Sequence, residues 1–169
     1  MRKSLRLIMF IKKKRCGWIK ATGCAEGRPQ RGYIPKENAT SPTVATEALF
    51  LTSVIDVKEN RCVATCDIDG AFLRMLMRTL THVKLTGKMA ELMVQSNPGK
   101  YKKYLCTGNN GEKLLWVEVQ KALYGCLESA RLLWDDITDY LTKSLGFEIN
   151  PYDHCVANKT INGKQCTIV

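Results

Sequence analysis

The segment Thr65-Cys66-Asp67-Ile68-Asp69-Gly70-Ala71-Phe72-Leu73 is the part of the chain around which we expect the fold to be organised. The β-rich run of residues 61–65 leads into it, so Asp67 is predicted to stand at the end of a strand. Alternation along a straight strand would place Asp67 and Asp69 on one face, although Gly70 can already turn the chain. Carboxylate oxygens at this position suit a hard cation such as Mg²⁺, and an ordinary Asp-x-Asp-Gly turn is the alternative interpretation.

Composition predicts one globular domain over residues 1–169 with a polyanionic partner. The chain has 169 residues, 45% of them hydrophobic, and carries 26 Lys and Arg against 16 Asp and Glu, for a net charge of +10. Such an excess of positive charge favours nucleic acid as the partner. Eight basic residues precede the first acidic residue, Glu26; they are Arg2, Lys3, Arg6, Lys12, Lys13, Lys14, Arg15 and Lys20. We interpret this part as a basic arm, and a transit peptide is the alternative.

The eight cysteines are interpreted as reduced, mostly buried thiols. None forms a Cys-x-x-Cys pair, and only Cys62 and Cys66 are close in sequence, which gives weak support to a small zinc-binding module. No stretch approaches the roughly 18 apolar residues of a membrane helix, so no membrane association is expected. The predicted location is intracellular, in a cytoplasmic particle or the nucleus, and the protein is not expected to be secreted.

Hydrophobic periodicity and turn signals predict an α+β fold in which helices pack on an antiparallel sheet. Asn109-Asn110-Gly111 indicates a hairpin, and Gly146 is placed to end the longest helix. The expected elements are a hairpin with a basic tip over 7–21, a core helix over 41–57, strands over 61–67 and 81–85, a helix over 87–94, a hairpin joining 104–107 to 113–120, a helix over 129–145, and strands over 147–149, 153–161 and 164–169. The last strand stops at Val169 without a polar tail, which we interpret as a truncation.

No competing active site is evident in the sequence. The two histidines are His82 and His154, and there is no nucleophile elbow, phosphate-binding P-loop or His-Glu-x-x-His motif. His154 and Cys155 are neighbours on an expected strand, where their side chains would point to opposite faces. The sequence therefore leaves Asp67 as the best candidate for a metal ligand.

Several segments together resemble the reverse transcriptase of copia-type long-terminal-repeat retrotransposons. Asp67-Ile68-Asp69-Gly70-Ala71-Phe72-Leu73 is similar to that family's first catalytic segment, Asp-Val-Lys-Thr-Ala-Phe-Leu. The segment Lys121-Ala122-Leu123-Tyr124-Gly125-Cys126-Leu127-Glu128-Ser129-Ala130-Arg131 is similar to Lys-Ser-Leu-Tyr-Gly-Leu-Lys-Gln-Ala-Pro-Arg. Trp134, Leu145-Gly146-Phe147 and Asp153-His154-Cys155 follow in the family's order, and the resemblance covers roughly residues 7 to 169.

The resemblance implies the fingers and part of the palm of a right-hand polymerase. Its activity would be RNA-directed DNA polymerisation with Mg²⁺ or Mn²⁺, acting on deoxynucleoside triphosphates and an RNA or DNA template-primer. Other domains of a retroelement polyprotein are possible partners. The implied site residues are Asp67 as catalytic metal ligand, Ile68 as a minor ligand through its carbonyl, Phe72 as the aromatic near the sugar 2′-hydroxyl, Tyr124 and Gly125 in the nucleotide pocket, and Lys20 near the triphosphate.

The chain also departs from the family pattern. Thr22 stands where an arginine is usual after Lys20-Ala21, and Glu128 replaces glutamine. Arg78-Thr79 falls where acidic residues are common, and the sequence stops before the family's second aspartate motif. We therefore expect a degenerate or truncated domain, and a non-catalytic nucleic-acid-binding remnant is the alternative.

The missing aspartate motif predicts that the purified chain does not polymerise, because Asp67 alone leaves the expected two-metal site without most of its charge. Primer extension on an RNA template with Mg²⁺ and deoxynucleotides measures this, with an intact reverse transcriptase as the positive control. Magnesium-dependent extension by the purified chain would contradict the expectation.

Overall fold

The computed structural model describes residues 4–169, which form two β-sheets and several helices. The strands of the larger sheet are β1 (Leu5–Lys13), β2 (Ile19–Ala25), β3 (His82–Thr86), β4 (Cys106–Thr107) and β5 (Lys113–Glu118), in the order β2-β1-β3-β5-β4. The smaller sheet has the order β6 (Glu148–Ile149), β7 (Ala157–Ile161) and β8 (Lys164–Ile168). The α+β class is confirmed. The expected purely antiparallel sheet is wrong, because β1 and β3 pair in parallel.

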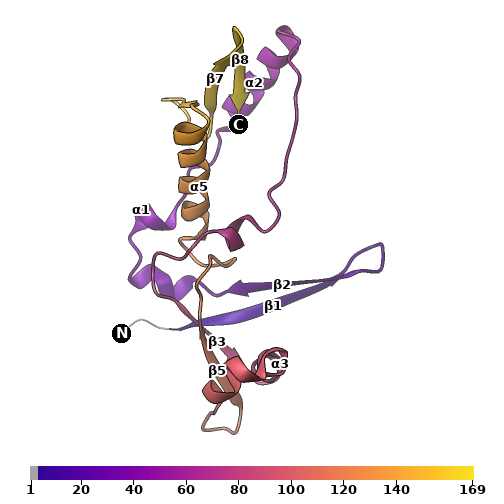
Figure 1. Cartoon of the computed structure of the whole chain (residues 1–169), viewed down its shortest axis with the longest axis vertical. Helices are drawn as coiled ribbons and strands as arrows, with labels where there is room; N and C mark the ends of the chain where they lie inside the picture. The colour runs from indigo at the N-terminus through magenta and orange to yellow at the C-terminus, as the bar shows by residue number, and fades with distance from the viewer. Residues whose placement is uncertain (1–3) are drawn as a thin grey trace.

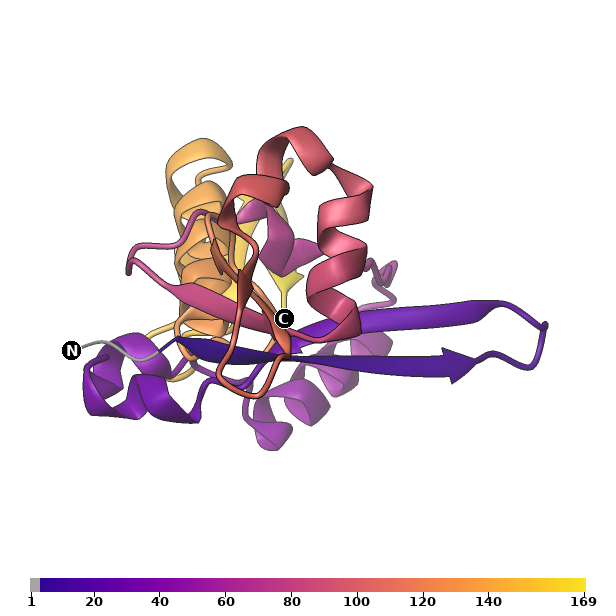
Figure 2. The ribbon, with the colours of Figure 1, turned by 90° about the horizontal axis from the view of Figure 1, so that it is seen from below.

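The helices connect and separate these two sheets. They are η1 (Arg28–Gly32), α1 (Lys36–Ala39), α2 (Thr46–Lys58), η2 (Ala71–Arg74), α3 (Lys88–Ser96), α4 (Pro98–Tyr101), η3 (Lys102–Tyr104), α5 (Ser129–Asp139) and the π-helical turn η4 (Tyr140–Ser144). Figure 1 shows an elongated molecule, with β3, β5 and α3 at one end, β7, β8 and α2 at the other, and α5 running between them. The β1–β2 hairpin extends sideways beyond the remaining elements (Figure 2). In residues 4–169 no helix is long and apolar enough to cross a membrane.

The main core lies on one face of the larger sheet. Leu5, Val83, Leu85 and Leu115 are at most 5% exposed there and pack with Ala90 of α3. These side chains alternate with outward-pointing neighbours along each strand, which is why the sheet has one covered face. Leu5 and Val83 are register partners, so the parallel β1–β3 pairing joins the N-terminal hairpin to the core.

The thiols are less buried than expected. Cys126 is buried in the core, and burial raises its pKa from the ordinary 9.0 to about 11, although a hydrogen bond from the Leu123 backbone acts in the opposite direction. Cys16, Cys62, Cys66 and Cys106 are exposed, so the expectation of mostly buried thiols is wrong. These cysteines lie on a hairpin tip, an extended segment and a short edge strand, where no second layer covers them.

Both expected hairpins are present, and the last two expected strands form a third. The β1–β2 tip turns at Gly17, and the β4–β5 turn contains Gly111, both with positive φ. The β7–β8 hairpin turns at Asn162 and Gly163, whose φ angles are +51° and +75°. Asn-Gly is favoured there because both central residues of this kind of turn require positive φ. The expected strand over 153–161 begins only at Ala157, since Asn150 Oδ1 accepts hydrogen bonds from the Tyr152 and Asp153 backbone and holds a turn.

Two expected helix boundaries differ in the structure. The helix expected over 129–145 is α-helical to Asp139 and continues as η4, and Gly146 follows with a φ of +67°. The helix expected from Ser41 begins at Thr46 as α2. The backbone N–H of Ala45, the residue before α2, donates to the Asp153 carboxylate at 2.8 Å. A contact from a distant loop therefore marks the start of α2.

The interpretation of α2 as core scaffold is also wrong. The helix contains no buried residue, and Leu49, Phe50, Leu51, Val54 and Val57 are between 48% and 83% exposed. Its apolar side chains lie all around the helix axis, so no single stripe can be covered by one neighbouring element. Only part of α2 faces β7 and β8, across the cleft described below.

Asp153 makes the start of α2 sensitive to acid. Its carboxylate accepts hydrogen bonds from the backbone N–H groups of Ala45 and Cys155, which lower its pKa below the ordinary 3.8. Because the folded pKa is depressed, the stabilising effect is fully present above the ordinary pKa and is lost as pH falls through the folded value.

We therefore predict that the protection of the Ala45 amide from hydrogen exchange decreases as pH falls below the ordinary pKa of an aspartate, 3.8. Asp153→Ala should abolish this change. Hydrogen exchange followed by NMR measures it after correction for the intrinsic pH dependence of exchange. Asp139→Ala serves as the control, because that exposed carboxylate pairs with Lys143 far from Ala45. Equal Ala45 protection in Asp153→Ala and the unmodified chain would contradict the prediction.

Candidate functional site

The segment that carries Asp67 is extended but belongs to no strand. Residues 62–69 are all exposed, and residues 62–67 have no hydrogen bond to any other residue in the range 4–169. The predicted strand ending at Asp67 is therefore wrong. A β-rich composition produces a strand only when a neighbouring backbone satisfies its N–H and C=O groups, and no described strand lies against this segment.

The predicted turn after Asp69 is present. Gly70 has a φ of +62°, a left-handed conformation that glycine adopts without a steric penalty. Ala71 N donates to Ile68 O at 3.1 Å, and Leu73 N donates to Gly70 O at 2.8 Å. These bonds form η2, which places Phe72. The Ile68 carbonyl, predicted as a minor metal ligand, thus has one of its two lone pairs occupied within the turn.

Asp67 and Asp69 provide the oxygen chemistry expected for Mg²⁺. Both carboxylates are exposed, and hard cations are often bound by one or two carboxylates together with water and substrate phosphates. Within residues 4–169 there is no group of three or more His, Cys, Asp or Glu side chains that could hold a metal ion. A cation at Asp67 would therefore take most of its ligands from water or a bound phosphate.

The structure brings together two of the predicted site residues, Phe72 and Tyr124. Their ring centroids are 4.9 Å apart, and the rings meet edge to face at 69°. Aromatic pairs prefer this geometry, because the positive edge of one ring meets the negative face of the other. Phe72 is half-buried and Tyr124 is 38% exposed, so the pair leaves part of Tyr124 open to solvent.

The loop carrying Tyr124 and Gly125 is fixed against the end of β2 by close backbone contact. Ala25 N donates to Tyr124 O at 2.7 Å. A Cβ on Gly125 would lie 2.0 Å from Ala25 O, and one on Gly27 would lie 2.1 Å from Gly125 O. Gly125 also has a φ of +86°. Glycine at both positions therefore allows two stretches of backbone to touch.

Two buried polar residues support this loop, and the sequence had singled out only one of them, Glu128. Gln30 is fully buried; its Oε1 accepts from Leu127 N at 2.8 Å, and its Nε2 donates to Thr81 Oγ1 at 3.5 Å. Glu128 is 4% exposed and accepts from both the N–H and the hydroxyl of Thr79. Glu128, which departs from the family pattern, is thus matched by the nearby donors of Thr79.

The other departure, Arg78, is paired by residues of α5. Asp135 accepts from Arg78 at 2.7 Å and from Arg131 at 2.8 Å. The Arg131 guanidinium also lies over the Trp134 ring, 4.7 Å from its centroid. A basic residue at position 78 is therefore compensated by the carboxylate of Asp135.

The predicted site residue Lys20 stands apart from the others. It is exposed on β2, opposite Lys12 of β1, in the part of the hairpin near the tip. No interaction described within residues 4–169 joins Lys20 to Asp67, Phe72 or Tyr124. The structure thus brings Phe72, from the turn that follows Asp67, into contact with Tyr124, the neighbour of Gly125, and leaves Lys20 on a separate projecting element.

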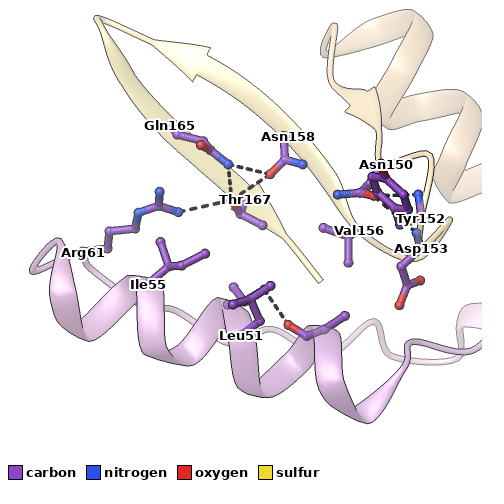
Figure 3. A pocket seen from close by; sticks show the side chains of 12 residues that line it. Leu51, Ile55, Arg61, Asn150, Tyr152, Asp153, Val156, Asn158, Gln165 and Thr167 are labelled. Carbon is purple, nitrogen blue, oxygen red and sulfur yellow. Dashed lines mark hydrogen bonds between the residues drawn. The ribbon is translucent and has the colours of Figure 1, made fainter.

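A cleft of about 310 Å³ lies between α2 and the β7–β8 hairpin (Figure 3). Leu51, Ile55 and Val156 form its apolar part. On the β7–β8 side, Asn158 Oδ1 accepts from Gln165 Nε2 and Thr167 Oγ1, both at 2.9 Å. These polar side chains satisfy one another, and Arg61 also reaches Thr167, at 3.3 Å.

A wider groove of about 610 Å³ separates the extended segment from the free edge of β8. Residues 61–64 line one side, and residues 163–167 line the other. No sequence signal predicts these two hollows, because they depend on how distant elements approach each other.

No family model, curated protein or solved structure matches the chain.

A substitution at Gly125 tests how tightly the loop carrying Tyr124 is held against β2. Gly125→Ala should destabilise the fold by about 1–3 kcal/mol or more, because the new Cβ meets the Ala25 carbonyl as well as requiring a left-handed backbone. Denaturant unfolding measures the change. Gly111→Ala is the matched control, since its φ is +79° and a Cβ added there would have nothing within 4 Å. Equal destabilisation by the two variants would show that the close contact contributes nothing.

Proposed function

We propose that this chain is the fingers and part of the palm of a copia-type reverse transcriptase, a domain that binds a nucleic-acid template-primer and deoxynucleoside triphosphates. The observation that carries the proposal is the contact between Phe72 and Tyr124. These residues come from the two segments that most resemble the family, and they are distant in sequence. Residues that act on one nucleotide must meet in space, and this pair does.

The chemistry of the proposed site follows from the residues around this pair. Asp67, helped by the Ile68 carbonyl, would hold Mg²⁺, and the ion would supply charge neutralisation for phosphoryl transfer. The Phe72 ring is fixed by its edge contact with Tyr124 and limits the space for a sugar 2′-hydroxyl. The exposed part of Tyr124 offers a surface for a base, and Gly125 lets the loop touch the end of β2, which holds Tyr124 in place. Lys20 would reach the triphosphate only through movement of the hairpin or of the ligand.

Charge supports the nucleic-acid part of the proposal. The net charge is +10, and β1, β2 and the tip between them contain no acidic residue. The tip carries Lys13, Lys14 and Arg15, all exposed. Lysine and arginine side chains that displace counterions from phosphates give an affinity that falls as salt rises.

A second candidate function is nucleic-acid binding without catalysis. It is favoured by the finding that no third acidic, histidine or cysteine side chain joins Asp67 and Asp69 in a potential metal site within residues 4–169. In this case the basic hairpin would still bind phosphates, and the carboxylates would remain an exposed turn.

Salt titration of binding to an RNA–DNA hybrid tests the proposal. The double variant Lys13→Gln/Lys14→Gln should reduce the slope of log affinity against log salt by about 2, because each phosphate contact contributes nearly one unit. Lys58→Gln/Lys164→Gln is the control, since it removes the same charge from exposed positions outside the hairpin. Affinity of the unmodified chain that does not fall with salt would contradict the proposal.

A measurement of nucleotide binding distinguishes the two candidate functions. If the polymerase proposal holds, a deoxynucleoside triphosphate binds the chain–hybrid complex only with Mg²⁺, and Asp67→Asn weakens this binding. Hybrid binding without any magnesium-dependent nucleotide binding would leave the non-catalytic function in its place.

A further inference from the structure

The two faces of the larger sheet differ in chemistry. The face that carries Leu5, Val83 and Leu115 is the covered core face. The strand register assigns the alternate side chains to the opposite face. We call this opposite face the open face. Its most prominent members are Arg6, Phe10, Lys12, Lys20, Lys84 and Trp116.

One row of the open face crosses three strands. Arg6 of β1 is the register partner of Lys84 of β3, and Lys84 is the partner of Trp116 of β5. Lys84 Nζ lies 5.8 Å from the centroid of the Trp116 ring, so a cation and an aromatic surface are directly adjacent. Trp116 is 40% exposed, and Arg6 is exposed.

A second group lies farther along the hairpin. Phe10 is 58% exposed and is paired with Thr22, and the next outward-facing pair toward the tip is Lys12 with Lys20. A strand spacing of ~4.8 Å and a rise of ~3.3 Å per residue place the Phe10 and Trp116 backbones ~16 Å apart. The open face thus presents two exposed rings with cations beside each.

Negative charge is nearly absent from this face. Glu118, opposite His82 at one end of the β3–β5 pair, is the single acidic residue in the five described strands. Within residues 4–169, Arg6, Lys12, Lys20 and Lys84 form none of the described salt bridges. Arg6, Lys12 and Lys20 are exposed and Lys84 is half-buried, and none of the four is neutralised by a described ion pair.

We propose that the open face binds single-stranded nucleic acid. Exposed rings on a sheet offer stacking surfaces to unpaired bases, and the neighbouring cations match the phosphate backbone. A duplex has its bases already stacked and could use only the cations. The inference rests on the proposed nucleic-acid function, but it uses residues other than Asp67, Phe72, Tyr124 and Gly125, and it identifies an unpaired strand as the ligand of this surface.

Fluorescence anisotropy of a labelled short oligothymidylate tests the inference. Trp116→Ala and Phe10→Ala should each weaken binding about tenfold, within the range expected for loss of one stacked base. Lys84→Gln should reduce the slope of log affinity against log salt by slightly less than one. Trp116→Phe keeps a ring at the position and should retain most of the affinity, which separates stacking from a folding defect.

Matched controls lie off the open face. Tyr104 is 53% exposed on η3, so Tyr104→Ala removes an exposed ring elsewhere. Lys113 belongs to the core face of β5 by register, so Lys113→Gln removes a strand lysine from the other side. Neither change should weaken oligothymidylate binding more than about twofold.

The outcomes separate this inference from the proposed function. Undiminished oligothymidylate binding in both Trp116→Ala and Phe10→Ala, or an equal loss in Tyr104→Ala, would overturn the open face as the site. Hybrid binding that persists when oligothymidylate does not bind at all would overturn the inference and leave the proposed function standing. Failure of both ligands to bind the folded chain would overturn both.

Discussion

The contact between the end of β2 and the loop at Tyr124 is the constraint on which the arrangement of the site depends. Two backbone segments approach so closely that neither Gly27 nor Gly125 has room for a Cβ. The hydrogen bond from Ala25 to Tyr124 then links the N-terminal hairpin to the loop that precedes α5. Buried Gln30 strengthens the same junction by bonding Leu127 and Thr81. Because this junction is rigid, Tyr124 is held where Phe72 can meet it.

The two ends of the molecule differ in how far their apolar surfaces are covered. The larger sheet has a covered face with buried Leu5, Leu85 and Leu115. At the other end, α2 has no buried residue, and β8 has a free edge that borders a groove. The carboxylates of Asp67 and Asp69 lie on the segment that crosses between these ends. The site therefore joins a well-packed part of the fold to a part whose apolar surfaces remain exposed.

The sequence predicted the local features well. Hairpins followed from Gly17, Asn110-Gly111 and Asn162-Gly163, because turn geometry depends on a few neighbouring residues. The long helix followed from its hydrophobic periodicity, and its end followed from Gly146. These signals are local in the chain, and the structure places them within a few residues of their expected positions.

Features that depend on distant partners were not predicted. The run before Asp67 has strand composition, but composition cannot supply the neighbouring backbone that a strand requires. The start of α2 coincides with a bond to Asp153, and the roles of Gln30 and Glu128 depend on Leu127 and Thr79. The resemblance implied that Phe72 and Tyr124 each lie near the nucleotide, but their contact was not predicted, since nothing in the spacing of the two residues requires it.

The unpaired segment has a consequence for how the protein behaves at high concentration. Residues 62–66 read Cys-Val-Ala-Thr-Cys, a short uncharged run with β propensity, and all of them are exposed with unpaired backbone groups. Such a run is a template for intermolecular β-pairing, and the free edge of β8 offers a second one on the same molecule. Open templates of this kind on one chain permit stacking of copies, so colloidal stability depends on the positive net charge that keeps the copies apart.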